Sequence, residues 1–88
     1  MLNRTINVQL ITPESLIVNQ ASISASLPGR EGKFTILAGH EKTIFSISPG
    51  MLEIEGTDKT IVQYEIGSGI VRTDGSECFI LTSYTKAL

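Results

Sequence analysis

Apolar and polar residues alternate along most of the chain. From Ile6 to Leu10 every second residue is apolar, and Pro13 follows shortly after the run. In the segment 21–27, Ile23 and two further apolar residues alternate with three serines. Successive side chains of a strand point to opposite faces, whereas a helix repeats about every 3.6 residues. The alternation therefore predicts half-buried strands.

Turn-forming residues interrupt the alternation at short intervals, and no segment has the apolar spacing of a helix. Gly67 and Gly69 interrupt a late strand and indicate a bulge or a close approach of a neighbouring backbone. We expect strands at residues 6–11, 15–19, 21–27, 34–37, 45–48, 51–55, 60–66, 68–73 and 77–83.

Strands at this spacing favour an all-β fold. A single open sheet of this length leaves one apolar face uncovered, so the strands are expected to pack in two layers. The expected architecture is a small antiparallel β-sandwich or flattened barrel of about eight to ten short strands. One domain, residues 1–88, accommodates the chain.

The segment 27–50, LPGREGKFTILAGHEKTIFSISPG, concentrates the turn signals. Glu31 and Lys33 lie on either side of Gly32 in a predicted tight turn, so both side chains should project from the end of the sandwich, while Phe34 anchors the turn in the core.

Two adjacent apolar residues, Ile44 and Phe45, follow in the next predicted strand. Because neighbouring side chains of a strand point to opposite faces, one belongs to the core and the other points outward. An outward apolar side chain at this place is what a partner would cover.

The order of residues from 28 to 40, PG-x-EG-x-F-x-IL-x-GH, followed by PG at 49–50, resembles the amino-terminal domain of the epsilon subunit of F-type ATP synthase. LITPE at 10–14 is similar to the opening strand of that family, and GSGIV at 67–71 to its glycine-rich late strand. The resemblance covers nearly all of residues 5–83. It implies a β-sandwich, in agreement with the alternation.

The resemblance also implies a function, that of a non-catalytic rotor subunit in the central stalk. Such a subunit links gamma to the membrane c-ring and couples proton transport to ATP synthesis. In the family one turn touches the c-ring, and its residues here are Arg30, Glu31, Gly32 and Lys33. A second surface faces gamma, and its residues here are His40, Glu41, Lys42, Thr43 and Phe45. The implied location is peripheral, on the cytoplasmic face of the bacterial inner membrane or, alternatively, on the stromal face of the thylakoid.

Members of the family usually continue into a helical hairpin that in many bacteria restrains ATP hydrolysis. The sequence ends at Leu88. The resemblance therefore implies the scaffold role and lends no support to the restraining role or to ATP binding.

Composition and charge argue against several classes of function. The formal net charge is −2, and the seven lysines and arginines are scattered, so no basic stripe is available for a nucleic-acid backbone. The alternative function, a small β-barrel module for single-stranded nucleic acid, would need a basic groove with surface aromatics. No apolar run approaches the roughly 20 residues that span a bilayer, so we expect a soluble chain.

Residues with potential chemistry are few. His40 is the only histidine, so we expect it to have a structural or interface role. Cys78 precedes an apolar run and should behave as a small buried hydrophobic residue. Glu53 and Glu55 should share a solvated sheet face, on a strand away from the turn at 30–33. No catalytic residue, metal site, cofactor or small-molecule substrate is expected.

Overall fold

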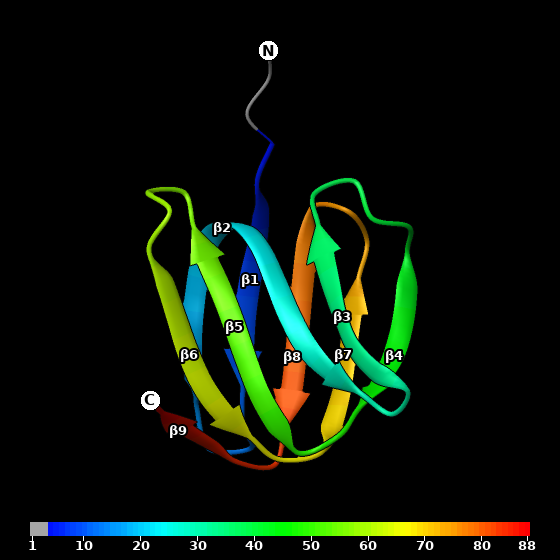
Figure 1. Ribbon diagram of the computed structural model, residues 1–88, viewed down its shortest axis with the longest axis vertical. Coiled ribbons are helices and arrows are strands. Elements are labelled where there is room, and N and C mark those ends of the chain that lie inside the picture. Colours follow the sequence, from blue (N-terminus) through cyan, green and yellow to red (C-terminus); the bar gives the residue numbers. More distant parts are fainter. Residues whose placement is uncertain (1–3) are drawn as a thin grey trace.

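The structure is built from strands. The computed structural model describes residues 4–88, which contain nine strands and no helix (Figure 1). The strands are β1 (Ile6–Ile11), β2 (Leu16–Gly29), β3 (Gly32–Leu37), β4 (Thr43–Ile47), β5 (Gly50–Gly56), β6 (Ile61–Ile66), β7 (Gly69–Thr73), β8 (Glu77–Thr82) and β9 (Thr85–Ala87). The all-β prediction is confirmed, and the number of strands lies in the predicted range.

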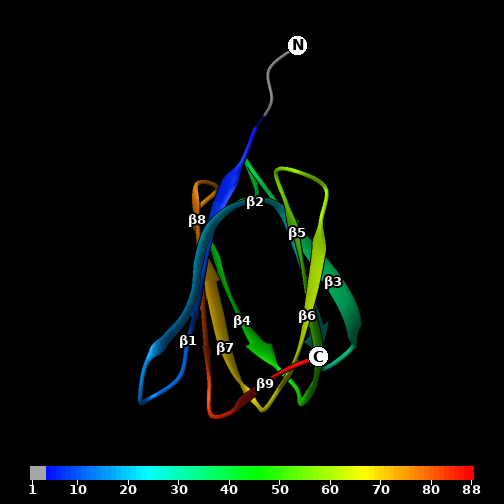
Figure 2. The same cartoon turned by 90° about the vertical axis from the view of Figure 1, so that its left-hand side faces the viewer.

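The strands form two layers that β2 joins. In one layer β1, β8, β7 and β4 lie side by side in that order, and in the other β5 lies between β2 and β6, with β9 beyond β6. The first half of β2 pairs with β1, and the second half pairs with β3 on one side and β5 on the other. Figure 2 shows β2 arching from the first layer to the second. The predicted two-layered β-sandwich is therefore confirmed.

The course of β2 corrects the sequence prediction, which had two separate strands at 15–19 and 21–27. The structure has one strand of 14 residues. Its pairing register with β5 shifts between Ser22 and Ser24. An irregularity of this kind bends a strand and increases its twist. The bend allows one continuous strand to serve both layers.

The shift in β2 also changes which side chains point inward. Val18 and Ser22 are buried before it, and Ala25 and Leu27 are buried after it. Ser22 was expected on the polar face, but its side chain is fully buried, and its hydroxyl donates to the carbonyl oxygen of Gln20 at 3.2 Å. The alternation is thus regular within each half of β2 and changes phase between them.

Two further features differ from the expectation. The pairing of β1 with β8 is parallel, from Asn7 opposite Glu77 to Ile11 opposite Leu81, so the sandwich is not purely antiparallel. The strand β9 pairs with β6 and was not predicted. The parallel direction of β1 and β8 depends on the connections between distant segments, which the local pattern does not show. The three residues of β9 are too few to show a period of two.

Aliphatic side chains from nearly every strand fill the core. The fully or almost fully buried hydrophobic residues are Ile6, Val8, Leu10, Val18, Ala25, Leu27, Ile36, Ile47, Leu52, Ile54, Ile66, Val71, Cys78 and Ile80. Burial raises the pKa of the Cys78 thiol to about 12. This cysteine is therefore the buried hydrophobic residue that the sequence predicted.

The predicted close approach at the glycine-rich strand is also confirmed. A Cβ atom on Gly69 would collide with the carbonyl oxygen of Leu81, and one on Gly67 would lie 2.5 Å from Ser83 Oγ. Beside them, the buried Thr82 hydroxyl donates to the Gly67 carbonyl at 2.9 Å. The backbones of β7 and β8 are close here because no side chain separates them.

Candidate interaction surfaces

The turn between β2 and β3 contains the four residues that the sequence analysis assigned to the c-ring. Arg30, Glu31, Gly32 and Lys33 are all exposed, and Gly32 has φ of 125°. That backbone conformation favours glycine, which confirms the predicted tight turn. The turn lies at the lower end of the sandwich in Figure 1.

Lys33 does not extend freely from the turn. Its Nζ lies 3.2 Å from Glu53 Oε1 on β5, and Gln63 Nε2 on β6 donates to Glu53 Oε2 at 2.8 Å. The Gln63 hydrogen bond, followed by the hydrogen bond and the charge of Lys33, lowers the pKa of Glu53. The expectation that Glu53 lies away from the turn was therefore wrong. Arg30 and Glu31 remain as the charged groups of the turn that form no ion pair within residues 4–88.

Aromatic side chains pack beside the turn. Phe34 is half-buried, packs against the core and lies with its ring centroid 4.7 Å from that of Phe45 on β4. The two rings border a shallow pocket of about 400 Å³, whose rim includes Arg30 and Glu31. Phe34 thus anchors the turn as predicted, and Phe45 supports it from a second strand.

The segment 40–45, which contains the five residues assigned to gamma, runs from the β3–β4 loop into β4. The His40 ring packs edge-on against Phe45, with 5.9 Å between centroids, and its Nδ1 lies 3.0 Å from the Glu41 carbonyl oxygen. The Thr43 hydroxyl donates to the same carbonyl at 2.9 Å. Glu41 and Lys42 are exposed. The loop is therefore held by local bonds, and His40 has the structural contacts that its sequence context suggested.

The pair at 44–45 divides between the two faces of β4. Phe45 is half-buried against the core, and Ile44 is 66% exposed. The sequence predicted this division without assigning the outward residue, and Ile44 was not among the residues assigned to gamma. Whether Ile44 or Phe45 points outward depends on the side of β4 that the second layer covers, and the local sequence does not show that side.

Other chemistry is scarce in the described part of the chain. Residues 4–88 contain no group of three histidine, cysteine, aspartate or glutamate side chains placed to hold a metal ion. Glu53 and Glu55 alternate on β5 and share its outer face, as expected, and both are partly exposed. Within the same residues, no helix is available that could cross a membrane.

Comparison with known proteins gives a consistent result. The family model described as "ATP synthase, Delta/Epsilon chain, beta-sandwich domain" matches residues 5–86. The chain is 31% identical over 83 residues to the ATP synthase epsilon chain of Sulfurimonas denitrificans, and the match covers 94% of this chain and 64% of that protein. It is 35% identical over 83 residues to the epsilon chain of Rickettsia bellii, covering 92% of this chain and 77% of that protein.

Solved structures agree with these relatives. A chain in the mitochondrial ATP synthase of Euglena gracilis, a structure with OSCP, F1 and the c-ring, superposes with a TM-score of 0.89 and 26% identity over 94% of this chain and 53% of that chain. A chain from the central stalk and c-ring of the Tetrahymena thermophila enzyme has a TM-score of 0.80 at 17% identity over 98% of this chain and 69% of that chain, which shows the shared fold. Because the family model matches nearly the whole length, this chain belongs to the family of ATP synthase delta/epsilon chains, as a β-sandwich domain.

Proposed function

We propose that the chain is a non-catalytic rotor subunit of an F-type ATP synthase, which joins the gamma subunit to the c-ring. The observation that carries the proposal is the match of residues 5–86 to the delta/epsilon β-sandwich family. This match supports a role in assembly, with gamma and the c-ring as the proposed partners. The chain would be peripheral to the membrane, on the cytoplasmic face of the bacterial inner membrane.

The proposed mechanism is mechanical. A proton-driven ring turns in the membrane, gamma carries the rotation to the catalytic head, and this subunit fixes the foot of gamma to the ring. The double-layered core supports this role, because close-packed interiors deform little under load. The bond between Lys33 and Glu53 supports it further, since it connects the turn proposed to contact the ring to β5 in the same layer.

The test is capture of the chain from its own membranes. An affinity-tagged copy is expressed in the source cells, the membranes are solubilised in mild detergent, and the captured proteins are identified by mass spectrometry. Gamma and the c subunit should be enriched over an untagged control. Absence of both from the captured material would contradict the proposal, and a shift of a labelled single-stranded oligonucleotide by the purified chain would support the nucleic-acid alternative instead.

A further inference from the structure

Strand β3 lies at an edge of its layer. It pairs with β2 along its whole length, and within residues 4–88 no strand pairs with its other side. An edge strand presents unpaired backbone groups to which another strand can bond. A lysine on an edge commonly prevents such pairing, but Glu53 compensates the charge of Lys33 here at 3.2 Å. The edge of β3 is therefore open to an added strand.

The direction of the free backbone groups follows from the hydrogen bonds of β2. Pro28 lies opposite Lys33, has no N–H, and its carbonyl oxygen accepts from Ser48 N at 2.8 Å. The pair of Pro28 and Lys33 therefore exchanges no ladder bond. Opposed residues of an antiparallel ladder alternate between bonded and non-bonded pairs, so Thr35 shares the orientation of Lys33. The N–H and C=O groups of Lys33 and Thr35 point away from β2, toward the free edge.

The other layer extends beyond β3. In Figure 1 β4 lies further to the right than β3, and Figure 2 shows the two strands in different layers. Phe34 on β3 and Phe45 on β4 are both only half-buried, with 4.7 Å between their ring centroids. The two rings border the pocket of about 400 Å³ beside the 30–33 turn. A strand added to β3 would lie over β4 and would place one large apolar side chain in this pocket.

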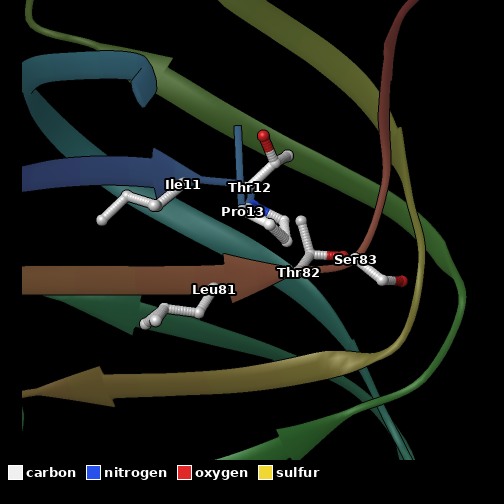
Figure 3. A pocket seen from close by; sticks show the side chains of 6 residues that line it. All are labelled: Ile11, Thr12, Pro13, Leu81, Thr82 and Ser83. Carbon is white, nitrogen blue, oxygen red and sulfur yellow. The ribbon is translucent and has the colours of Figure 1, made fainter. Parts of the chain in front are cut away.

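A second hollow of the surface has no free edge beside it. Figure 3 shows a depression of about 360 Å³ where β1 and β8 end side by side, bordered in part by Ile11, Pro13 and Leu81. There β1 pairs with β2 and β8, and β8 pairs with β1 and β7. Neither strand has an edge left for an added backbone. At β3, in contrast, the pocket and the unpaired backbone groups lie together.

We infer that the free edge of β3 binds an extended peptide segment of another protein, which adds one strand to the layer of β2, β3 and β5. The backbone of the segment bonds to Lys33 and Thr35, and one large apolar side chain enters the pocket between Phe34 and Phe45. A carboxylate next to that side chain would lie near Arg30, which forms no ion pair within residues 4–88. In this mode of recognition, main-chain hydrogen bonds provide affinity and a side-chain pocket provides specificity. The inference goes beyond the proposed function, since it requires neither gamma nor the c-ring.

A single extended segment fits this edge better than a second copy of the chain. Pairing of β3 with β3 of another copy about a two-fold axis would bring the β4 strands of both copies behind the same junction, because β4 extends beyond β3 in each (Figure 1). The two β4 strands would then compete for one position. A lone segment has no second layer and avoids this overlap.

The test starts from a phage-displayed library of random heptapeptides, selected against the immobilised chain. Selected peptides should alternate polar and apolar residues, with one large apolar residue at a fixed position. The tightest peptide is synthesised with N-methyl groups on either its odd or its even amides, and affinity is measured by isothermal titration calorimetry. Because a ladder uses alternate amides, one methylated form should lose at least about tenfold in affinity and the other should bind like the parent peptide.

Two matched pairs of variants test the edge and the pocket. Thr35→Pro removes the free N–H at an edge position, where proline is tolerated, and Thr35→Ala retains it. Affinity for the selected peptide should fall at least about tenfold for Thr35→Pro and less than about threefold for Thr35→Ala. Phe45→Ala should also weaken binding by about tenfold, whereas Phe79→Ala, which removes an aromatic ring from β8, should not. Circular dichroism checks that each variant is folded.

Amide hydrogen exchange of the wild-type chain is a measurement that needs no variant. The Lys33 and Thr35 amides should exchange rapidly in the free chain and be slowed at least about tenfold by the selected peptide. The Phe34 and Ile36 amides, which face β2, should be protected in both states.

Three outcomes would overturn the inference. The first is a selection that yields no binding peptide. The second is equal binding of both methylated forms with unchanged exchange of the Lys33 and Thr35 amides. The third is sedimentation of the wild-type chain as a dimer in which these two amides are protected, which would identify a second copy as the occupant. None of these outcomes bears on the capture of gamma and the c subunit, so the proposed function is tested separately.

Discussion

Lys33 Nζ lies 3.2 Å from Glu53 Oε1, so a side-chain bond connects the two strands that flank β2. The residues are 20 positions apart in the sequence. The contact adds a side-chain link between the turn and β5. It leaves Arg30 and Glu31 as the charged residues of the turn that form no ion pair within residues 4–88.

The first prediction concerns the pH response of Glu53. Replacing Lys33 by Met should raise the Glu53 pKa toward its ordinary value, and Gln63→Leu should raise it more, because the Gln63 hydrogen bond is the larger cause of the lowering. A lowered folded-state pKa contributes stability that is present above the unfolded-state pKa and is lost as pH falls through the folded-state pKa. The stability difference between wild type and Lys33→Met should therefore disappear in acid.

Carboxyl-detected NMR titration measures the Glu53 pKa directly, and urea unfolding at neutral and acid pH measures the stability difference. Lys86→Met, on β9, is a control that removes a lysine without contact to Glu53. Superimposable Glu53 titration curves for wild type and Lys33→Met would show that the bond does not persist in solution.

The second prediction concerns the buried thiol. Cys78→Ser places a hydroxyl in the aliphatic core without a dedicated hydrogen-bond partner. It should reduce the free energy of unfolding by about 1–3 kcal/mol. Because burial raises the Cys78 pKa to about 12, the wild-type thiol should react with a thiol reagent at neutral pH only as fast as the chain opens. Labelling followed over a urea series measures this rate. Rapid labelling of the native chain would contradict the buried position.

The alternation of apolar and polar residues was sufficient to predict the strands that keep one face on the core along their whole length. From β5 to β8 the predicted and observed strands agree closely, and β5, β7 and β8 bury every second side chain. The prediction divided β2 at Gln20, whereas the structure has one continuous strand whose register with β5 shifts between Ser22 and Ser24. The phase change is needed to reach the second layer, and no local signal in the sequence marks it.

The turn at 30–33 was predictable from the sequence, and the side-chain contacts around it were not. The turn at 30–33 was correctly placed because its backbone has a positive φ at residue 32, a conformation that favours the glycine found there. The partner of Lys33 was missed because Glu53 meets it only across β2. The proximity of Ile11, Leu81 and Ile70 was missed for the same reason, since these residues become neighbours only when β1 pairs with β8 and β8 with β7.

The third prediction concerns the close contact of β7 with β8. Gly69→Ala places a methyl group against the Leu81 carbonyl oxygen, so one of the two backbones must move. The expected loss in the free energy of unfolding is about 1–3 kcal/mol, the usual cost of overpacking. Ser68→Ala, at the exposed neighbouring position, should change it by less than about 0.5 kcal/mol. Urea unfolding compares the two, and equal stability would show that the strands separate at no cost.

The last prediction concerns recognition of the c-ring by the turn. Arg30 and Glu31 are exposed and form no ion pair within residues 4–88, so exchanging their charges in the variant Arg30→Glu with Glu31→Lys should leave the fold intact. Exposed charges contribute at most about 1 kcal/mol each to stability. The exchange preserves the net charge and reverses the local pattern, so retention on purified c-ring with gamma should fall, and should fall most at low salt. Gly32 stays unchanged, because its φ of 125° is part of the turn.

The matched control for that variant is Glu65→Lys with Lys86→Glu. These residues are paired across β6 and β9, so the same two charges are exchanged away from the turn. The control should be retained like wild type at every salt concentration. If both exchanged variants are retained equally across the series, the turn does not contact the ring, because a surface that recognises charge must respond when its pattern is inverted. Loss of retention at all salt concentrations in the turn variant alone would place the contact in the turn. The contact would then depend on the shape of the turn, which packs beside the Phe34 and Phe45 rings, and not on its charges.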